Sequence, residues 1–274
     1  MSKIFNKIFN KINTIYPNLL KDRTRKSLFN TKFFNFSIFG WCKWVFMIIV
    51  KVIFFYNLFG TLFVTPKVFS PSMTPTLETN DFILMSTSVY KLKVPFLKNI
   101  TLCNISKPKI GDIVGFTSKP YSENMTFTKR ILAGPGDKIQ YKNGILFIND
   151  KIVKLKYIKQ YKFIENNKEY DGMLYEETLP NGNKHFVLYN NKFGEYYNAE
   201  DTTEPFILGD KEYFCGGDNR HNSDDSRTSI GIIPEDQIIG KGILILFSNG
   251  NITTFEITSF IKGIKWNRCL TWLV

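Results

Sequence analysis

The chain has 274 residues, of which 43% are hydrophobic and 16% aromatic, so it can bury one or two cores and is not a disordered protein. Its formal charge of +12 is concentrated in residues 1–39, where eight lysines and arginines stand against Asp22 alone. A nucleic-acid-binding protein would need a basic patch in its folded domain together with a recognisable motif, and we find neither. The charge distribution therefore favours a membrane surface over nucleic acid as the partner of the basic segment.

Residues 1–43 are predicted to form a basic cytoplasmic segment that contains an amphipathic helix. Apolar residues recur at helical spacing from Ile4 to Tyr16 with lysines between them, and Pro17 ends the pattern. Such a helix would lie on anionic lipid. An organellar transit peptide is the alternative, but transit peptides favour Arg and Ser, whereas this segment favours Lys, Asn and Ile.

Residues 44–64 read WVFMIIVKVIFFYNLFGTLFV and predict one transmembrane helix. At about 1.5 Å per residue this stretch spans about 30 Å, the thickness of a bilayer core. Lys51 weakens the prediction, since a lysine in mid-span costs on the order of 3 kcal/mol unless it snorkels to the interface. A buried helix of a soluble protein is the alternative. The basic segment before the span predicts a cytoplasmic N-terminus, with residues 66–274 on the opposite side of the membrane.

After the span the pattern changes to short β-rich runs separated by turn residues, which predicts a mainly β domain over residues 66–250. Seven runs are predicted strands: Phe82–Met85, Ile113–Phe116, Phe127–Leu132, Lys138–Tyr141, Ile145–Ile148, Lys151–Lys156 and Gly242–Phe247. Asn143-Gly144 is typical of a hairpin turn. Within this domain we expect a non-catalytic β insertion over 140–210, and residues 251–274 to form a C-terminal extension. The predicted fold class is mainly β with one N-terminal transmembrane helix.

The four cysteines are Cys42, Cys103, Cys215 and Cys269. They form no CxxC pair, and no histidine lies at metal-ligand spacing from them, so no metal site is predicted. A disulfide between Cys103 and Cys215 stays open in an oxidising compartment, but the spacing does not argue for it. Buried free thiols are the favoured interpretation.

Three polar segments carry the chemistry: SPSMTPTL at 70–77, TKRIL at 128–132 and GDNRHNSDDSR at 217–227. A serine hydrolase normally needs a base, but the chain has only two histidines, His185 and His221. A serine paired with a neutral lysine performs the same chemistry without a histidine. The sequence therefore predicts a serine nucleophile that is activated by a lysine.

Ser72 is the predicted nucleophile and Lys129 the predicted general base. Prolines on either side of Ser72 predict an extended, well-fixed backbone, although an ordinary Ser/Pro loop is the alternative. In a strand, Lys129 shares a face with Phe127 and Ile131. Burial on an apolar face disfavours the ammonium form, and lowering the lysine pKa from about 10.4 toward 7–8 needs roughly 4 kcal/mol.

In this order and after a membrane span, the three segments resemble the type I signal peptidase family, membrane-anchored Ser-Lys proteases that remove signal peptides from exported proteins. The resemblance covers residues 44–250, and the last residues resemble the bacterial C-terminal extension. It implies that Ser223 orients Lys129 and that the Ser70 side chain and the Ser72 N–H form the oxyanion hole. It also implies that no metal or organic cofactor is needed.

Two further groups of residues receive expected roles. Four charged residues of the third segment are expected to form a structural network of charge-assisted hydrogen bonds: Asp218, Arg220, Asp225 and Arg227. Four apolar residues are candidates to line the pockets for the small residues of a signal peptide that adds as a strand: Val68, Met73, Leu77 and Phe127. His221 stands where many relatives carry Asp. A Ser-His-Asp triad with Asp224 or Asp225 is the alternative, but it would leave the lysine motif unexplained.

The sequence thus predicts a serine endopeptidase of the bacterial inner membrane whose partners are signal peptides and anionic lipid; it leaves the oligomeric state open. An organellar inner-membrane peptidase of the same family is one alternative. A soluble-type Ser-Lys autoprotease is another, against which the membrane span argues. A catalytically inactive, membrane-anchored protein that only holds signal peptides is the alternative from a different class.

Overall fold

The computed structural model describes residues 38–118, 121, 125–165, 168–189, 201–250 and 261–273. The amphipathic helix predicted between Ile4 and Tyr16 lies outside the described residues. The chain divides into two units, residues 1–56 and 57–274. The boundary falls inside the helix that follows the basic segment.

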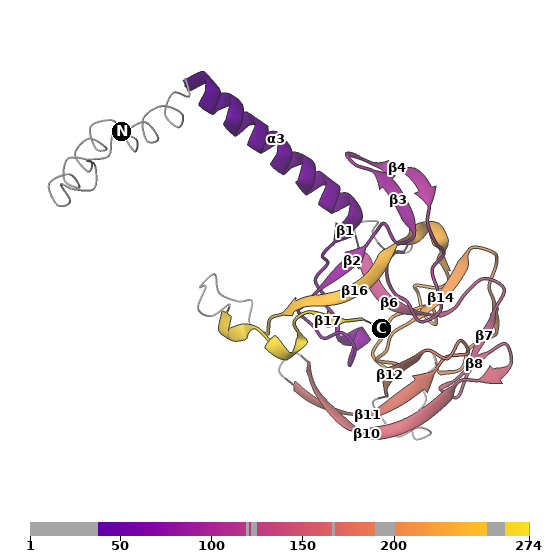
Figure 1. The fold of residues 1–274 in the computed structure, drawn as a ribbon. Coiled ribbons are helices and arrows are strands. Elements are labelled where there is room, and N and C mark those ends of the chain that lie inside the picture. Colours follow the sequence, from indigo (N-terminus) through magenta and orange to yellow (C-terminus); the bar gives the residue numbers. More distant parts are fainter. Residues whose placement is uncertain are drawn as a thin grey trace. The chain divides into compact units, whose positions relative to one another are not determined.

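That helix, α3, runs from Ile38 to Leu62 (Figure 1). Within the described part of the chain, its residues Gly40–Leu62 form the one helix that is long and apolar enough to cross a membrane. Large apolar side chains along it are exposed, as at Trp44 and Phe55, unlike those of a buried soluble helix. The helix begins at Ile38, before the predicted Trp44. It ends at Leu62 rather than at Val64, because Phe63–Val64 forms strand β1.

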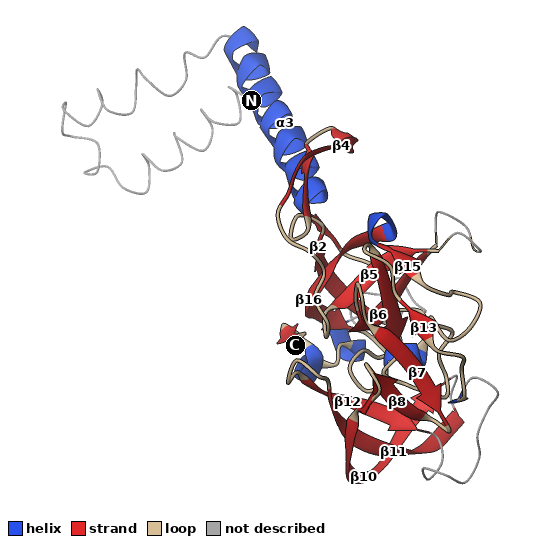
Figure 2. Ribbon diagram, turned by 90° about the vertical axis from the view of Figure 1, so that its right-hand side faces the viewer, coloured by secondary structure: helices blue, strands red, loops and turns tan. Residues whose placement is uncertain are grey.

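The second unit is built on an eight-stranded sheet whose neighbouring strands pair antiparallel (Figure 2). Its strand order is β1-β2-β16-β5-β6-β14-β15, and β17 pairs with β16. The strands after β1 are β2 (Asp81–Ser86), β5 (Ile113–Thr117), β6 (Thr126–Ala133), β14 (Glu212–Gly216), β15 (Ile233–Pro234), β16 (Ile238–Ser248) and β17 (Thr271–Trp272). The predicted strands in these ranges are confirmed, and so is the mainly β fold class.

Three smaller sheets complete the unit: β3-β4, β13-β7-β8-β9 and β10-β11-β12. Their strands are β3 (Lys91–Val94), β4 (Leu97–Asn104), β7 (Lys138–Lys142), β8 (Ile145–Ile148), β9 (Lys151–Ile152), β10 (Lys154–Glu165), β11 (Lys168–Thr178), β12 (Lys184–Tyr189) and β13 (Phe206–Ile207). The β7–β8 hairpin turns at Asn143 and Gly144, whose φ values of 50° and 74° are those the Asn-Gly signal predicts. The single strand predicted over Lys151–Lys156 is divided between β9 and β10.

The core residues that matter for the site belong to two clusters of buried side chains. One cluster joins β5, β6 and β14 through Val114, Ile131 and Cys215. The other joins β2 to the segment after the helix, through Ile83 and Leu77. The first polar segment and the lysine strand are therefore both anchored in packed apolar surroundings.

All four cysteines are free, so no disulfide joins Cys103 to Cys215. Only Cys215 is fully buried. The prediction of buried thiols is wrong for Cys42, which is exposed on α3, and for Cys103, which is exposed on the two-stranded β3–β4 ribbon. Cys269 is half-buried.

Candidate active site

Ser72 lies in a single 3₁₀ turn, η1, formed by Pro71–Met73. The predicted extended backbone is therefore wrong at Ser72 itself and holds for the flanking residues Ser70 and Thr74. The physical reason is that the fixed φ of proline also suits the first position of a helical turn. The Thr74 N–H closes the turn by donating to the Pro71 carbonyl at 2.9 Å.

Apolar residues of the same segment anchor this turn in the core. Met73 and Leu77 are 1% and 0% exposed and pack with Ile83. Neither therefore offers a surface to a substrate, contrary to the predicted pocket-lining role. Val68 is also buried, whereas Phe127 is half-buried and stacks on Phe116. Phe127 is thus the pocket candidate with accessible surface.

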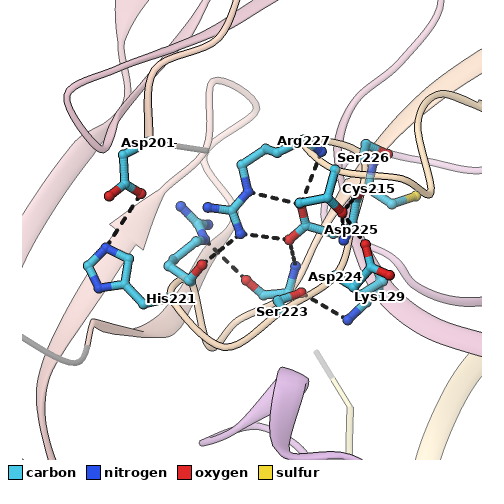
Figure 3. A network of polar contacts seen from close by, with 12 residues as sticks. Lys129, Asp201, Cys215, His221, Ser223, Asp224, Asp225, Ser226 and Arg227 are labelled. Carbon is cyan, nitrogen blue, oxygen red and sulfur yellow. Dashed lines mark hydrogen bonds and ion pairs between the residues drawn. The ribbon is translucent and has the colours of Figure 1, made fainter. Parts of the chain in front are cut away.

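Lys129 lies in β6, 3% exposed, between strands β5 and β14. Its Nζ donates to Ser223 Oγ at 2.9 Å (Figure 3). Burial lowers the pKa of Lys129 to about 8, although the carboxylates of Asp225 and Asp224 act in the opposite direction. The apolar environment thus outweighs the acidic neighbours, and a useful fraction of the amine is neutral near neutral pH.

The third segment connects Ser72 to Ser223. The Asn219 N–H donates to the Ser72 carbonyl at 3.0 Å. A Cβ atom added at Gly217 would collide with Ser223 Oγ and lie 2.5 Å from the Ser72 carbonyl oxygen. The absence of a side chain at Gly217 therefore lets the two serine residues approach each other, and Ser223 in turn bonds to Lys129.

Ser72 Oγ pairs with Ser70 Oγ at 3.0 Å. Among the described residues, the amine of Lys129 donates to Ser223 and not to Ser72. The structure thus gathers the predicted nucleophile, base, orienting hydroxyl and oxyanion donor, but in this conformation the nucleophile–base hydrogen bond is not formed. Catalytic hydrogen bonds often tighten only when substrate binds.

The four charged residues predicted to form a network make ion pairs, two of them with partners that the sequence did not reveal. Asp225 pairs with Arg227 at 2.8 Å, as expected, and accepts the Gly217 N–H at 3.0 Å. Asp218 pairs with Arg130, and Arg220 with Glu177. Burial raises the pKa of the Asp225 carboxyl, but the Arg227 guanidinium and hydrogen bonds bring it down to about 2. The network is therefore charged at neutral pH and surrounds Gly217.

His221 does not meet the acids required by the alternative triad. Its Nε2 lies 3.5 Å from Asp201 (Figure 3). Its ring contacts Tyr189 edge-on. Burial lowers the pKa of His221. Asp224 and Asp225 act electrostatically on Lys129 instead, so the described residues do not form the alternative Ser-His-Asp triad.

A buried lysine of lowered pKa and two serines thus lie close together in this β-rich domain. The chain belongs to the signal peptidase family, peptidase S26, whose match covers residues 40–247. It is accordingly a serine peptidase of that family.

Three bacterial relatives illustrate the similarity. The signal peptidase I of Rickettsia massiliae (strain Mtu5) is 32% identical over 195 residues, covering 65% of this chain and 68% of that protein. The signal peptidase I of Rickettsia akari (strain Hartford) is 33% identical with the same coverage. That of Rickettsia canadensis (strain McKiel) is 33% identical over 65% of this chain and 69% of its own. A crystal structure of a signal peptidase I from Enterococcus faecalis V583 is 20% identical, covers 50% of this chain and 97% of its own, and has a TM-score of 0.28.

The close approach at Gly217 gives a first prediction. We expect Gly217→Ala to lower kcat by at least about tenfold, because the new methyl group must displace Ser223 or the Ser72 backbone, and small misplacements at a reacting centre cost one to two orders of magnitude. Peptide-bond cleavage by the purified full-length chain measures the effect. Gly134→Ala is the matched control, since its Cβ would meet Tyr213 at an ordinary 3.6 Å. Equal activity of both variants would contradict the tight contact.

Proposed function

We propose that this chain removes N-terminal signal peptides from exported preproteins, with Ser72 as nucleophile and Lys129 as general base. The observation that carries the proposal is the burial of Lys129, which lowers its pKa to about 8. The amine of this lysine lies 2.9 Å from Ser223 Oγ. A solvated lysine with a pKa near 10.4 would hold too little neutral amine to act as a base.

The mechanism follows from these contacts. Neutral Lys129 accepts the proton of Ser72 Oγ once that hydroxyl turns from Ser70 toward the amine, and Oγ attacks the carbonyl carbon of the scissile bond. The Ser72 N–H and the Ser70 hydroxyl stabilise the developing oxyanion. The lysine ammonium then protonates the leaving amine, and the same lysine activates the water that hydrolyses the acyl-enzyme.

The proposed substrate is an extended peptide that has small side chains just before the scissile bond. Alternate side chains of an extended peptide face the same way, so two small residues would enter shallow pockets. Phe127 is the pocket candidate that keeps accessible surface.

We further propose that the chain resides in a bacterial cytoplasmic membrane, with a cytoplasmic N-terminus and an extracytoplasmic catalytic domain. The bacterial relatives, the basic segment 1–39 and the membrane-length helix support this orientation. The basic segment would contact anionic lipid.

Cleavage of a preprotein in detergent micelles tests the function. We expect a single cut after a small residue, located by N-terminal sequencing of the product. Replacing that residue with Phe should lower kcat/KM by at least about 10²-fold, since a shallow pocket cannot hold a large ring.

The same replacement at the preceding position is the control, because its side chain points away from the pocket. Equal cleavage of both substrate variants would contradict the pocket proposal. Binding of preproteins without any cleavage would instead favour the inactive signal-peptide-binding protein.

A further inference from the structure

A buried charged cluster connects the β10–β11–β12 sheet to the catalytic segment. Its five members come from β6, β11, β12 and the third segment, and each is less than a tenth exposed: Arg130, Glu177, His185, Asp218 and Arg220. The sequence analysis assigned no role to three of them, namely Arg130, Glu177 and His185. Five ionisable side chains are costly to bury unless each is paired, so their arrangement needs a physical account.

Glu177 is the acidic member that the insertion contributes to the cluster. Its two carboxylate oxygens accept hydrogen bonds from Arg220 Nη1 at 2.7 Å and Nη2 at 2.6 Å. His185 Nε2 lies 3.2 Å from the same carboxylate and 3.9 Å from Asp218. Burial raises the pKa of Glu177, but Arg220 and His185 bring it down to about 2, so the carboxylate stays ionised. The bidentate geometry fixes the plane of the Arg220 guanidinium.

Arg220 connects this ion pair to Gly217, the residue that lies between the two active-site serines. Its Nε donates to the Gly217 carbonyl at 3.2 Å. Gly217 is the position where any side chain would strike Ser223 and the Ser72 carbonyl. A shift of the guanidinium therefore moves the peptide unit on which the approach of the two serines depends.

The backbone of the insertion docks on the same segment. The Arg220 N–H donates to the Leu188 carbonyl at 2.9 Å, and the Leu188 N–H donates to the Asp218 carbonyl at 2.8 Å. On its other side the segment holds Ser72 through the Asn219 N–H. Residues 218–220 thus lie between strand β12 and the nucleophile turn.

We propose that Glu177 is a positioning residue for catalysis, which acts through Arg220 to hold Gly217, and with it Ser72 and Ser223, in the reactive arrangement. The insertion over 140–210, predicted to be non-catalytic, then supplies one residue of the catalytic support. The inference rests on the proposed function of Ser72 and Lys129 and extends it.

The test compares Glu177→Gln with Glu176→Gln in preprotein cleavage by the full-length chain. Glu177→Gln keeps the size of the side chain but removes the charge that orients Arg220. We expect kcat to fall about 10- to 100-fold, with KM within about threefold of the wild type. Glu176 is the adjacent strand residue, and its side chain pairs with Lys184 at the surface, so its variant should keep wild-type kcat.

A double-mutant cycle separates positioning from mere stability. If Glu177 acts through Arg220, the double variant with Arg220→Gln should lose no more kcat than Arg220→Gln alone. Losses that multiply would overturn the proposal. So would a kcat within twofold of the wild type in Glu177→Gln, whatever its melting temperature. Should Glu177→Gln fail to fold, Glu177→Asp keeps the charge but shortens the reach, and wild-type kcat in that variant would overturn the proposal as well.

Lys129→Ala is measured in the same assay. Cleavage that survives in Lys129→Ala would contradict the proposed function. Cleavage that depends on Lys129 but is unaffected in the Glu177 variants would contradict the positioning role alone.

Discussion

Ser72→Ala and Lys129→Ala are each expected to lower kcat for preprotein cleavage by at least about 10³-fold. The first removes the attacking oxygen, and the second removes the base that takes its proton, so each variant stops the reaction at the same step. Single-turnover cleavage by the purified chain in detergent micelles measures both. Because the two residues act as a unit, the double variant should be no slower than either single one.

Two further variants make this result specific. Lys129→Arg keeps the positive charge but not the ability to become neutral, so we expect it to be as inactive as Lys129→Ala. His221→Ala should keep activity within about threefold, because His221 contacts Asp201 and Tyr189 away from the lysine. Activity lost in His221→Ala and kept in Lys129→Arg would indicate a histidine-based hydrolase.

The sequence predicts the parts of the fold that depend on local pattern. Alternating runs locate β5, β6, β7, β8 and β16 to within a few residues, because strand periodicity is a property of neighbouring side chains. The Asn143-Gly144 turn is recognisable because both residues accept positive φ. The apolar run that forms α3 is equally recognisable in the sequence, although the first and last residues of the helix are not.

Long-range pairing is what the sequence does not contain. Glu176 and Glu177 are adjacent acids in β11, yet one pairs with a lysine at the surface and the other with a buried arginine. Nothing local distinguishes them, since the difference arises only when β12 docks on residues 218–220. The ion pair of Arg130 could not be predicted for the same reason, because its partner Asp218 lies 88 positions away in the sequence.

The candidate site likewise combines features that the sequence shows with features that depend on long-range packing. Lys129 could be assigned because its apolar strand neighbours Phe127 and Ile131 are visible in the sequence. The helical turn at Ser72 and the burial of Leu77 could not be predicted. Proline permits both extended and helical-turn backbones, and only packing against Ile83 decides between them.

The pH dependence of kcat/KM distinguishes three candidate bases. We expect activity to rise about tenfold per pH unit up to about pH 8 and then to level off, because the reactive form is the neutral amine and burial lowers the pKa of Lys129 to about 8. An unshifted lysine would place this limb near 10.4, and a histidine base would place it near 6.5. Initial rates at substrate concentrations far below KM, in buffers of constant ionic strength, measure the limb.

The acidic neighbours provide an independent check on the assignment. Asp225 and Asp224 both raise the pKa of Lys129 by stabilising its charged form, and Asp225 also holds Gly217 and Arg227. Asp224 is the exposed one of the pair, so it can be neutralised without breaking that buried network. Asp224→Asn should therefore move the limb to lower pH, whereas Glu176→Gln, remote in β11, should leave it in place. A limb that moved to higher pH, or stayed fixed in Asp224→Asn, would show that the titrating base is not Lys129.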